Sequence, residues 1–524
     1  MAGHSQPVVK FWPGFVAAAL LAALTLGTLG AVAVRAEGWG VLGPADWAAI
    51  RFTVFQALLS AAISVGVAIP VAKALSRRQF LGRKLLVTLL GAPFILPVIV
   101  AVLGLLAVFG RNGIVSVVFG WVGLEPIQIY GLHGVVLAHV FFNLPLATRL
   151  ILQGWLATPS EQFRLAAALD LSAADLSRVL ERPMLRDVLP GAFMVVFVIC
   201  TTSFAVALAL GGGPRATTVE LAIYQAFRFG FDLGHAALLA LVQFSICAVA
   251  AGIMLWVRVP HASGVGLDRT VQRWDARGKV SGTIDAFWIS LAAVFLMLPL
   301  FMIIARGAPG ILDLPAHIVD AAGRSLLVAF TAALLTIGLA LPVALGAVGL
   351  RRIPWLAGSL EGVGYLAIAA SPLVIGTGLF LVLFPIANPV AIALPLTAVV
   401  NALMAVPFAL RALLPAVAQI EAQYGVLADS LGLLGWQRVR WLQLPRLRRP
   451  LGFSAGLAAA LSMGDLGVIA LFSDPDRTTL PMQMYRLMAG YRMDEAAGVA
   501  LLLLALSLAI FWIFDRGGRI DADR

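Results

Sequence analysis

Long apolar runs alternate with short polar segments along almost the whole chain. A helix needs about 20 apolar residues to cross the hydrocarbon core of a bilayer. It is also a structure that satisfies its own backbone polar groups there. We therefore expect an all-α integral membrane protein with about twelve transmembrane helices. The expected spans are 15–34, 52–72, 85–108, 131–152, 188–210, 234–257, 286–305, 325–349, 358–384, 390–411, 450–473 and 495–514.

Composition supports burial in lipid and changes how the positive charge is interpreted. Of the 524 residues, 61% are hydrophobic and 12% are charged, against about 25% charged in a soluble domain. The net charge is +11, but the basic residues cluster in short segments such as 76–84, 351–352 and 445–449. These segments predict a cytoplasmic side and contacts with anionic membrane lipid rather than nucleic-acid binding. An even number of spans then places both termini in the cytoplasm.

The two halves of the chain repeat one another. A shift of half the chain length aligns 145–149 with 407–411 and Pro183 with Pro445. We therefore predict a first half at 1–262, a basic cytoplasmic linker at 263–279 and a second half at 280–524. Parallel repeats of this kind place a transport pathway between the halves.

Two long loops, about 153–187 and 412–449, follow the fourth and tenth spans. Each is predicted to form a helix, a turn, a second helix and a proline. Each resembles the EAA loop of type I ABC-importer permeases, in which the first short helix couples the spans to a separate ATPase subunit. The matched residues are Glu161, Arg164, Leu165, Ala166, Ala167, Asp170 and Pro183 in the first loop, and Val426, Leu427, Ala428, Asp429, Gly432 and Pro445 in the second.

Both loops depart from the EAA pattern at its glutamate, where this chain has Arg164 and Val426. Two ways of contacting the ATPase stay open. Neighbouring carboxylates can replace the missing one, or docking is mainly apolar; the candidates are Glu161, Asp170, Glu421 and Asp429 for the first, and Leu165, Ala166 and Leu427 for the second. Gly432 can supply the positive φ that favours a helix end.

A more specific resemblance lies after the fifth span. The segment 201–225, with 464–468 and 478–481 in the second half, resembles the thiamine-importer permeases, and the resemblance extends over essentially the whole chain. It implies a bacterial inner-membrane protein served by a periplasmic thiamine-binding protein and by two copies of an ATPase. Ferric-iron importer permeases share the fused plan and remain the alternative.

Cargo with a fixed thiazolium charge requires polar groups along the pathway. Ser203 and Asp465 stand at repeat-related positions in the fifth and eleventh spans, and Asp465 is the preferred lining charge. Asp465 solvated at the outer mouth, or paired with Arg477, is an equal alternative. His139 and Asn143 in the fourth span either face the pathway or bond a neighbouring helix.

Enzyme chemistry is not expected in this chain. The sequence has no GxxxxGK[ST], HExxH or GxSxG motif. We therefore predict no catalytic residue, metal site or cofactor here, with ATP and magnesium bound by the partner ATPase. An intramembrane enzyme is the competing class, and proteolysis by the purified chain alone would support it.

Overall fold

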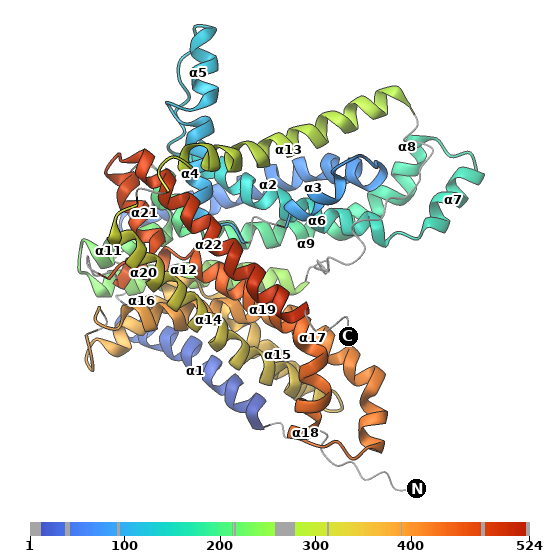
Figure 1. The fold of residues 1–524 in the computed structure, drawn as a ribbon, viewed down its shortest axis with the longest axis vertical. Coiled ribbons are helices and arrows are strands. Elements are labelled where there is room, and N and C mark those ends of the chain that lie inside the picture. Colours follow the sequence, from blue (N-terminus) through green and yellow to red (C-terminus); the bar gives the residue numbers. More distant parts are fainter. Residues whose placement is uncertain are drawn as a thin grey trace.

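In a computed structural model of the chain, the described residues are 12–36, 42–91, 95–211, 213, 216–256, 278–311, 314–388, 390–472 and 477–519. Within these ranges the chain is built from helices and turns (Figure 1). Most of the predicted linker, 263–277, lies outside the described residues.

The first half contributes twelve α-helices and one π-helical turn. They are α1 (Trp12–Arg35), α2 (Pro44–Arg77), α3 (Arg83–Leu89), α4 (Val98–Phe109), α5 (Ile114–Trp121), α6 (Leu132–Ala157), α7 (Ser160–Ala168), α8 (Ala173–Leu176), the π-turn η3 (Ser177–Glu181), α9 (Arg182–Thr201), α10 (Phe204–Leu210), α11 (Val219–Arg228) and α12 (Leu233–Trp256).

The second half repeats this order with fewer short helices. They are α13 (Lys279–Gly307), α14 (Ala316–Gly349), α15 (Pro354–Ala369), α16 (Pro372–Leu383), α17 (Ala393–Ser430), α18 (Trp436–Arg438), the π-turn η6 (Val439–Gln443), α19 (Leu444–Met463), α20 (Gly467–Phe472), α21 (Leu480–Ala489) and α22 (Met493–Arg519).

Ten helical segments among the described residues are long and apolar enough to cross a membrane. The pair α15 and α16, bent by 90°, makes eleven if it counts as one span. The expected eleventh span, 450–473, is divided between α19 and α20. The chain is thus an all-α integral membrane protein of about twelve spans.

The structure differs from continuous spans at four places, which are related by the repeat. The expected third, fifth, ninth and eleventh spans are each interrupted: the third lacks helix at 90–91 and 95–97, and the other three break at 202–203, 370–371 and 464–466. Pro97 and Pro372 stand at two of these breaks, and proline cannot donate the backbone hydrogen bond that would continue a helix. Broken backbone within a bilayer must be buried in protein. Accordingly, Ser371 Oγ accepts a hydrogen bond from Val374 N at the start of α16 (3.1 Å).

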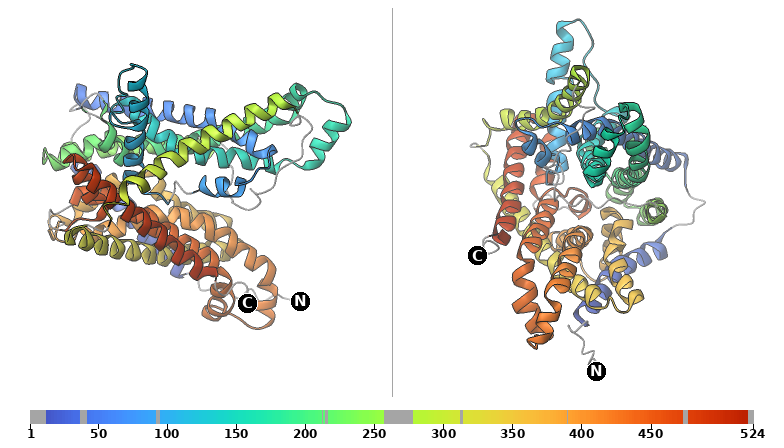
Figure 2. Two further views of the ribbon diagram at one scale, coloured as in Figure 1. Left: turned by 45° about the horizontal axis from the view of Figure 1, so that its top comes forward. Right: turned by 90° about the vertical axis from the view of Figure 1, so that its right-hand side faces the viewer.

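The first helix of each half packs against helices of the other half. α1 packs against α14, α15 and α16, while α13 packs against α2 and α4 (Figures 1 and 2). A glycine at each contact allows the backbones of α1 and α16, and of α13 and α4, to approach closely. A Cβ placed on Gly378 of α16 would lie 2.5 Å from Thr28 O of α1, and one on Gly104 of α4 would lie 2.8 Å from Pro299 O of α13.

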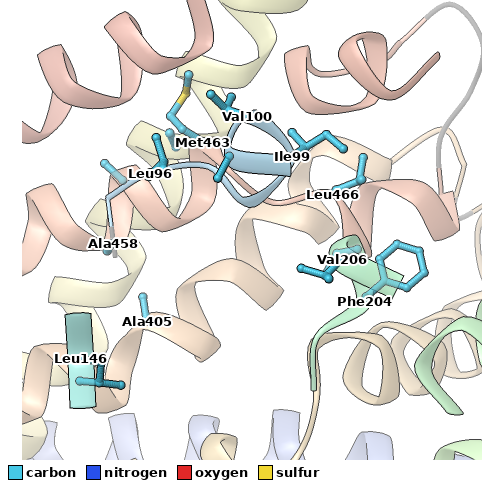
Figure 3. Packing of buried hydrophobic residues seen from close by; sticks show 14 of the residues in the cluster. Leu96, Ile99, Val100, Leu146, Phe204, Val206, Ala405, Ala458, Met463 and Leu466 are labelled. Carbon is cyan, nitrogen blue, oxygen red and sulfur yellow. The ribbon is translucent and has the colours of Figure 1, made fainter. Parts of the chain in front are cut away.

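Apolar side chains from both halves fill the seam between them. Figure 3 shows Leu96 and Val100 beside Met463, and Leu466 near Ile99, with Phe204 and Val206 of α10 close by. Their burial brings the interrupted spans of the two halves together. The seam in this structure is therefore closed by side chains at the level of the four breaks.

The two ends of the helix bundle carry different elements. The loops around α7 and α18 project at one end, together with the start of α1 and the end of α22 (Figures 1 and 2). The short helices α11 and α21 lie at the opposite end (Figure 1). Each short helix is tied to the second span of its own half, because Thr53 Oγ1 accepts from Val219 N (2.9 Å) and Ser325 Oγ accepts from Leu480 N (2.8 Å).

Candidate functional site

The first projecting loop is held together by apolar contacts. α6 ends at Ala157 and α7 begins at Ser160, so Thr158 and Pro159 interrupt the helix before the loop. Phe163, Ala166 and Leu176 are buried in a small cluster. Arg164 is exposed, and Leu165 is 61% exposed. The exposed side of α7 thus includes an arginine beside a leucine, Arg164 and Leu165.

An ion pair secures the base of this loop to the spans. Lys73 Nζ of α2 lies 2.7 Å from Glu181 Oε2. Trp155 Nε1 of α6 donates to the other oxygen of the same carboxylate at 3.3 Å. Movement of η3 is therefore linked directly to α2 and α6.

The second loop has the same outward pattern on a continuous helix. α17 runs without interruption from Ala393 to Ser430, well past the expected end of the tenth span at 411. Val426 is 82% exposed and Leu427 is 56% exposed, while Ala428 is buried. Ala428 and Ala166 face into their own loops. The exposed positions left for apolar docking are therefore Leu165 and Leu427, with Val426 beside the latter.

A buried arginine holds the second loop to α17. The side chain of Arg438 is 1% exposed. Its Nη2 lies 2.5 Å from Glu421 Oε2, and its Nη1 lies 2.6 Å from Asp429 Oδ1. Gln443 Nε2 also donates to Glu421 Oε1 (2.6 Å). Glu421 and Asp429, two of the carboxylates expected to face the ATPase, are thus engaged within the loop.

The protonation of Arg438 is secure in this setting. Burial lowers the pKa of its guanidinium, but the hydrogen bonds and charges of Glu421 and Asp429 raise it by more, so the net direction is upward. We did not expect this residue from the sequence. It stands among other arginines in a segment typical of a basic cytoplasmic loop, and no spacing distinguishes it.

Both loops turn through a residue with left-handed backbone. Gly432 has φ +67° and Asp170 has φ +52°. The glycine adopts the positive φ expected for it, and the aspartate adopts the same conformation without being glycine. Glu161 Oε1 accepts from Ser160 Oγ (3.1 Å), and Ala167 is exposed. Pro183 and Pro445 are the second residues of α9 and α19, the helices that directly follow the two π-turns.

Ser203 and Asp465 lie at the two repeat-related breaks. Ser203 immediately precedes α10, and Asp465 Oδ1 accepts from Gly467 N at the start of α20 (3.2 Å). A Cβ placed on Gly467 would lie 3.5 Å from the Phe204 ring, so the two breaks face each other across the seam. Asp465 Oδ2 is buried and forms no hydrogen bond in the described part of the chain.

His139 and Asn143 are buried in helix contacts of the first half. His139 Nδ1 lies 3.3 Å from Ser60 Oγ of α2. Asn143 Nδ2 donates to His139 O (2.9 Å) and lies 3.4 Å from Cys200 Sγ of α9. These partners correspond to the interpretation in which polar side chains bond neighbouring helices.

Comparison with known proteins covers nearly the whole chain. No protein-family model matches it. The chain is similar to the thiamine transport system permease protein ThiP of Escherichia coli (strain K12), with 39% identity over 531 residues, 98% of each chain. It is also similar to ThiP of Brucella abortus (strain 2308), with 37% identity over 523 residues, 98% of this chain and 96% of the relative. The chain belongs to the thiamine transport permease family.

The similarity of this permease to these two relatives thus extends over nearly its whole length. A shorter similarity, 31% identity over 99 residues, links 19% of the permease to the putative 2-aminoethylphosphonate transport system permease protein PhnV of Salmonella paratyphi A.

Proposed function

We propose that this chain is the membrane subunit of an ATP-binding-cassette importer that carries thiamine, with its phosphates as further cargo, from the periplasm to the cytoplasm. The observation that carries the proposal is identity of 37% to 39% to thiamine transport permeases over 98% of the chain. The paired helix arrangement, with its seam between two repeated halves, suits a pathway that opens between them.

The proposed partners follow from the two projecting loops. We assign one copy of an ATPase subunit to each loop, with Leu165 and Leu427 as the apolar contacts at its surface. ATP and magnesium are then bound by the ATPase, and this chain holds no cofactor. A periplasmic thiamine-binding protein docks at the opposite end, where α11 and α21 lie (Figure 1).

The proposed orientation places the loops in the cytoplasm of a bacterial cell, with the chain in the inner membrane. The basic segments beside the loops support this side, and both termini then lie on it. The halves 1–262 and 280–524 are the moving parts, joined by the basic segment 263–279. Closure of the ATPase pulls the loops together and parts the seam at the outer end.

Uptake of labelled thiamine tests the cargo directly. Cells lacking the chain are compared with cells carrying it, with ferric iron as a parallel cargo. Loss of thiamine uptake alone supports the proposal. Loss of iron uptake alone would replace the cargo with that of the alternative family, and normal uptake of both would reject an importer role.

Docking of the second loop is tested by Leu427→Asp. A carboxylate at this exposed apolar position opposes burial against the ATPase, so both thiamine uptake and transport-linked ATP hydrolysis should fall. Ala422→Asp is the matched control, because Ala422 is also exposed on α17 but lies on another side of the helix. Equal uptake in the two variants would remove Leu427 from the docking surface.

A further inference from the structure

One face of α11 carries a carboxylate and two aromatic rings. Glu220, Tyr224 and Phe227 follow the spacing that places side chains on the same side of a helix. Glu220 is 0% exposed, and Tyr224 and Phe227 are each 6% exposed. α11 packs against α2 and α12 of its own half and against α16 and α20 of the other. This face is therefore part of the seam that must open during transport.

The register between α11 and α16 is set at two points. Phe227 meets Phe380 of α16 edge-on, with ring centroids 4.5 Å apart. Glu220, about 10 Å back along α11, lies beside Ser371 at the start of α16. The Tyr224 ring meets Phe204 edge-on at 5.3 Å. In this closed arrangement the second half covers the carboxylate and the Phe227 ring.

In the described part of the chain, the groups that act on the Glu220 carboxylate are the neutral side chains of Ser371 and Gln243. Both of its carboxylate oxygens are buried without a hydrogen-bond partner in the described part of the chain. Gln243 of α12 lies beside it, but its amide nitrogen donates to Thr201 O (2.9 Å) and its amide oxygen is also unsatisfied. The charges of Arg228 and Arg486 act on Tyr224, one turn further along α11.

A buried carboxylate whose neighbours Ser371 and Gln243 are both neutral lacks a cationic partner among the described residues. An unpaired buried carboxylate costs several kcal/mol, so a sequence retains one where another state of the protein gives it a partner. A carboxylate flanked by aromatic rings is suited to an organic cation, because the rings attract positive charge at their faces. Asp465 fits this role less well, since one of its oxygens already caps α20.

We propose that Glu220, Tyr224 and Phe227 form a binding strip for a flat organic cation, such as the thiazolium ring of the cargo, when the two halves part. The inference rests on the proposed function and adds to it the site within the permease that recognises the charge. Withdrawal of α16 exposes the strip to the pathway, and its return covers Glu220 again and expels the cation.

The decisive variant is Glu220→Gln, which keeps the size and the hydrogen-bonding capacity of a protonated carboxyl group but removes the charge. It is assayed in the complete transporter, reconstituted with its ATPase and binding protein. We expect thiamine transport to fall about tenfold, which corresponds to about 1.4 kcal/mol, while ATP hydrolysis stimulated by the binding protein persists. The ATP consumed per thiamine therefore rises. Glu220→Asp, which retains the charge, should recover part of the transport.

Glu125→Gln is the matched control, because Glu125 is exposed and its replacement should leave transport unchanged. Unchanged transport by Glu220→Gln would overturn the proposal, since a neutral amide would then suffice. Parallel loss of transport, ATP hydrolysis and membrane level in both the Gln and Asp variants would also overturn it, by showing a purely structural role. Failure of the unmodified protein to carry thiamine would instead refute the proposed function.

Discussion

Replacement of Arg438 by leucine should loosen the second loop without disturbing the spans. Leucine is the natural choice because Leu176 occupies the corresponding place in the first loop, directly before the π-turn η3, and is fully buried there. The variant thus removes the charge from a site whose repeat-related counterpart is apolar. Glu421 and Asp429 lose their common partner.

The free-energy cost of the substitution depends on how well water can solvate the two carboxylates once Arg438 is removed. Breaking a buried ion pair costs about 3–5 kcal/mol, but the side chains of Glu421 and Asp429 are 21% and 55% exposed, respectively. Solvation of these groups lowers the loss to about 2 kcal/mol, the value of a hydrogen bond to a charged group. The open population of the loop should therefore rise about 30-fold.

Hydrogen exchange of the purified permease measures this opening. Amides in 421–443 should lose about 30-fold in protection, while those in 160–181 stay unchanged. Arg440→Leu is the control, because Arg440 is exposed and lies over the Trp441 ring at 5.3 Å. Unaltered exchange in Arg438→Leu, or equal effects of both variants, would refute the role assigned to the buried cluster.

Two further predictions concern backbone conformation and helix crossings. Gly432→Ala, at φ +67°, should destabilise the second loop by about 1 kcal/mol. Asp170→Gly, at φ +52°, should stabilise the first loop. Hydrogen exchange measures the stability of each loop, and unchanged exchange in either variant would argue against the turn conformation at that position. Gly378→Val should lower the thermal unfolding temperature, because its Cβ would lie 2.5 Å from Thr28 O and overpacking costs about 1–3 kcal/mol. Gly358→Val is the control, because Gly358 has open space around it. Equal shifts in the unfolding temperature of the two variants would contradict the close crossing of α1 and α16.

Hydropathy predicted the spans well because a helix needs an apolar surface whether it faces lipid or the protein interior. It did not predict the four breaks, because backbone that is broken but buried between other helices remains apolar in sequence. Pro97 and Pro372 marked two of the breaks, but proline also occurs inside unbroken helices here, as at Pro70 and Pro342. Only the surrounding packing separates the two outcomes.

The candidate site was partly predictable for a similar reason. Leu165 and Leu427 were named as docking candidates because the two loops resemble the EAA loop, and both side chains are exposed in the structure. Arg438 and Glu220 depend instead on partners distant in the chain. Glu220 lies beside Ser371 of the other half, and no local sequence pattern predicts such a contact. The same holds for the exchange of α1 and α13 between the halves.

That exchange affects the order in which the protein is made. When the first half has entered the membrane, α1 can pack against α12, but its contacts with α14, α15 and α16 form only after those helices are synthesised. Likewise, α4 contacts α10 within its own half but gains its contacts with α13 and α22 only later. The native protein is thus completed only by late pairing of early helices, and the peptide connection between the halves keeps each at a high effective concentration for the other. Fusion into one chain therefore speeds assembly during biogenesis, and a cell that received the halves as separate fragments would depend on their chance encounter in the bilayer.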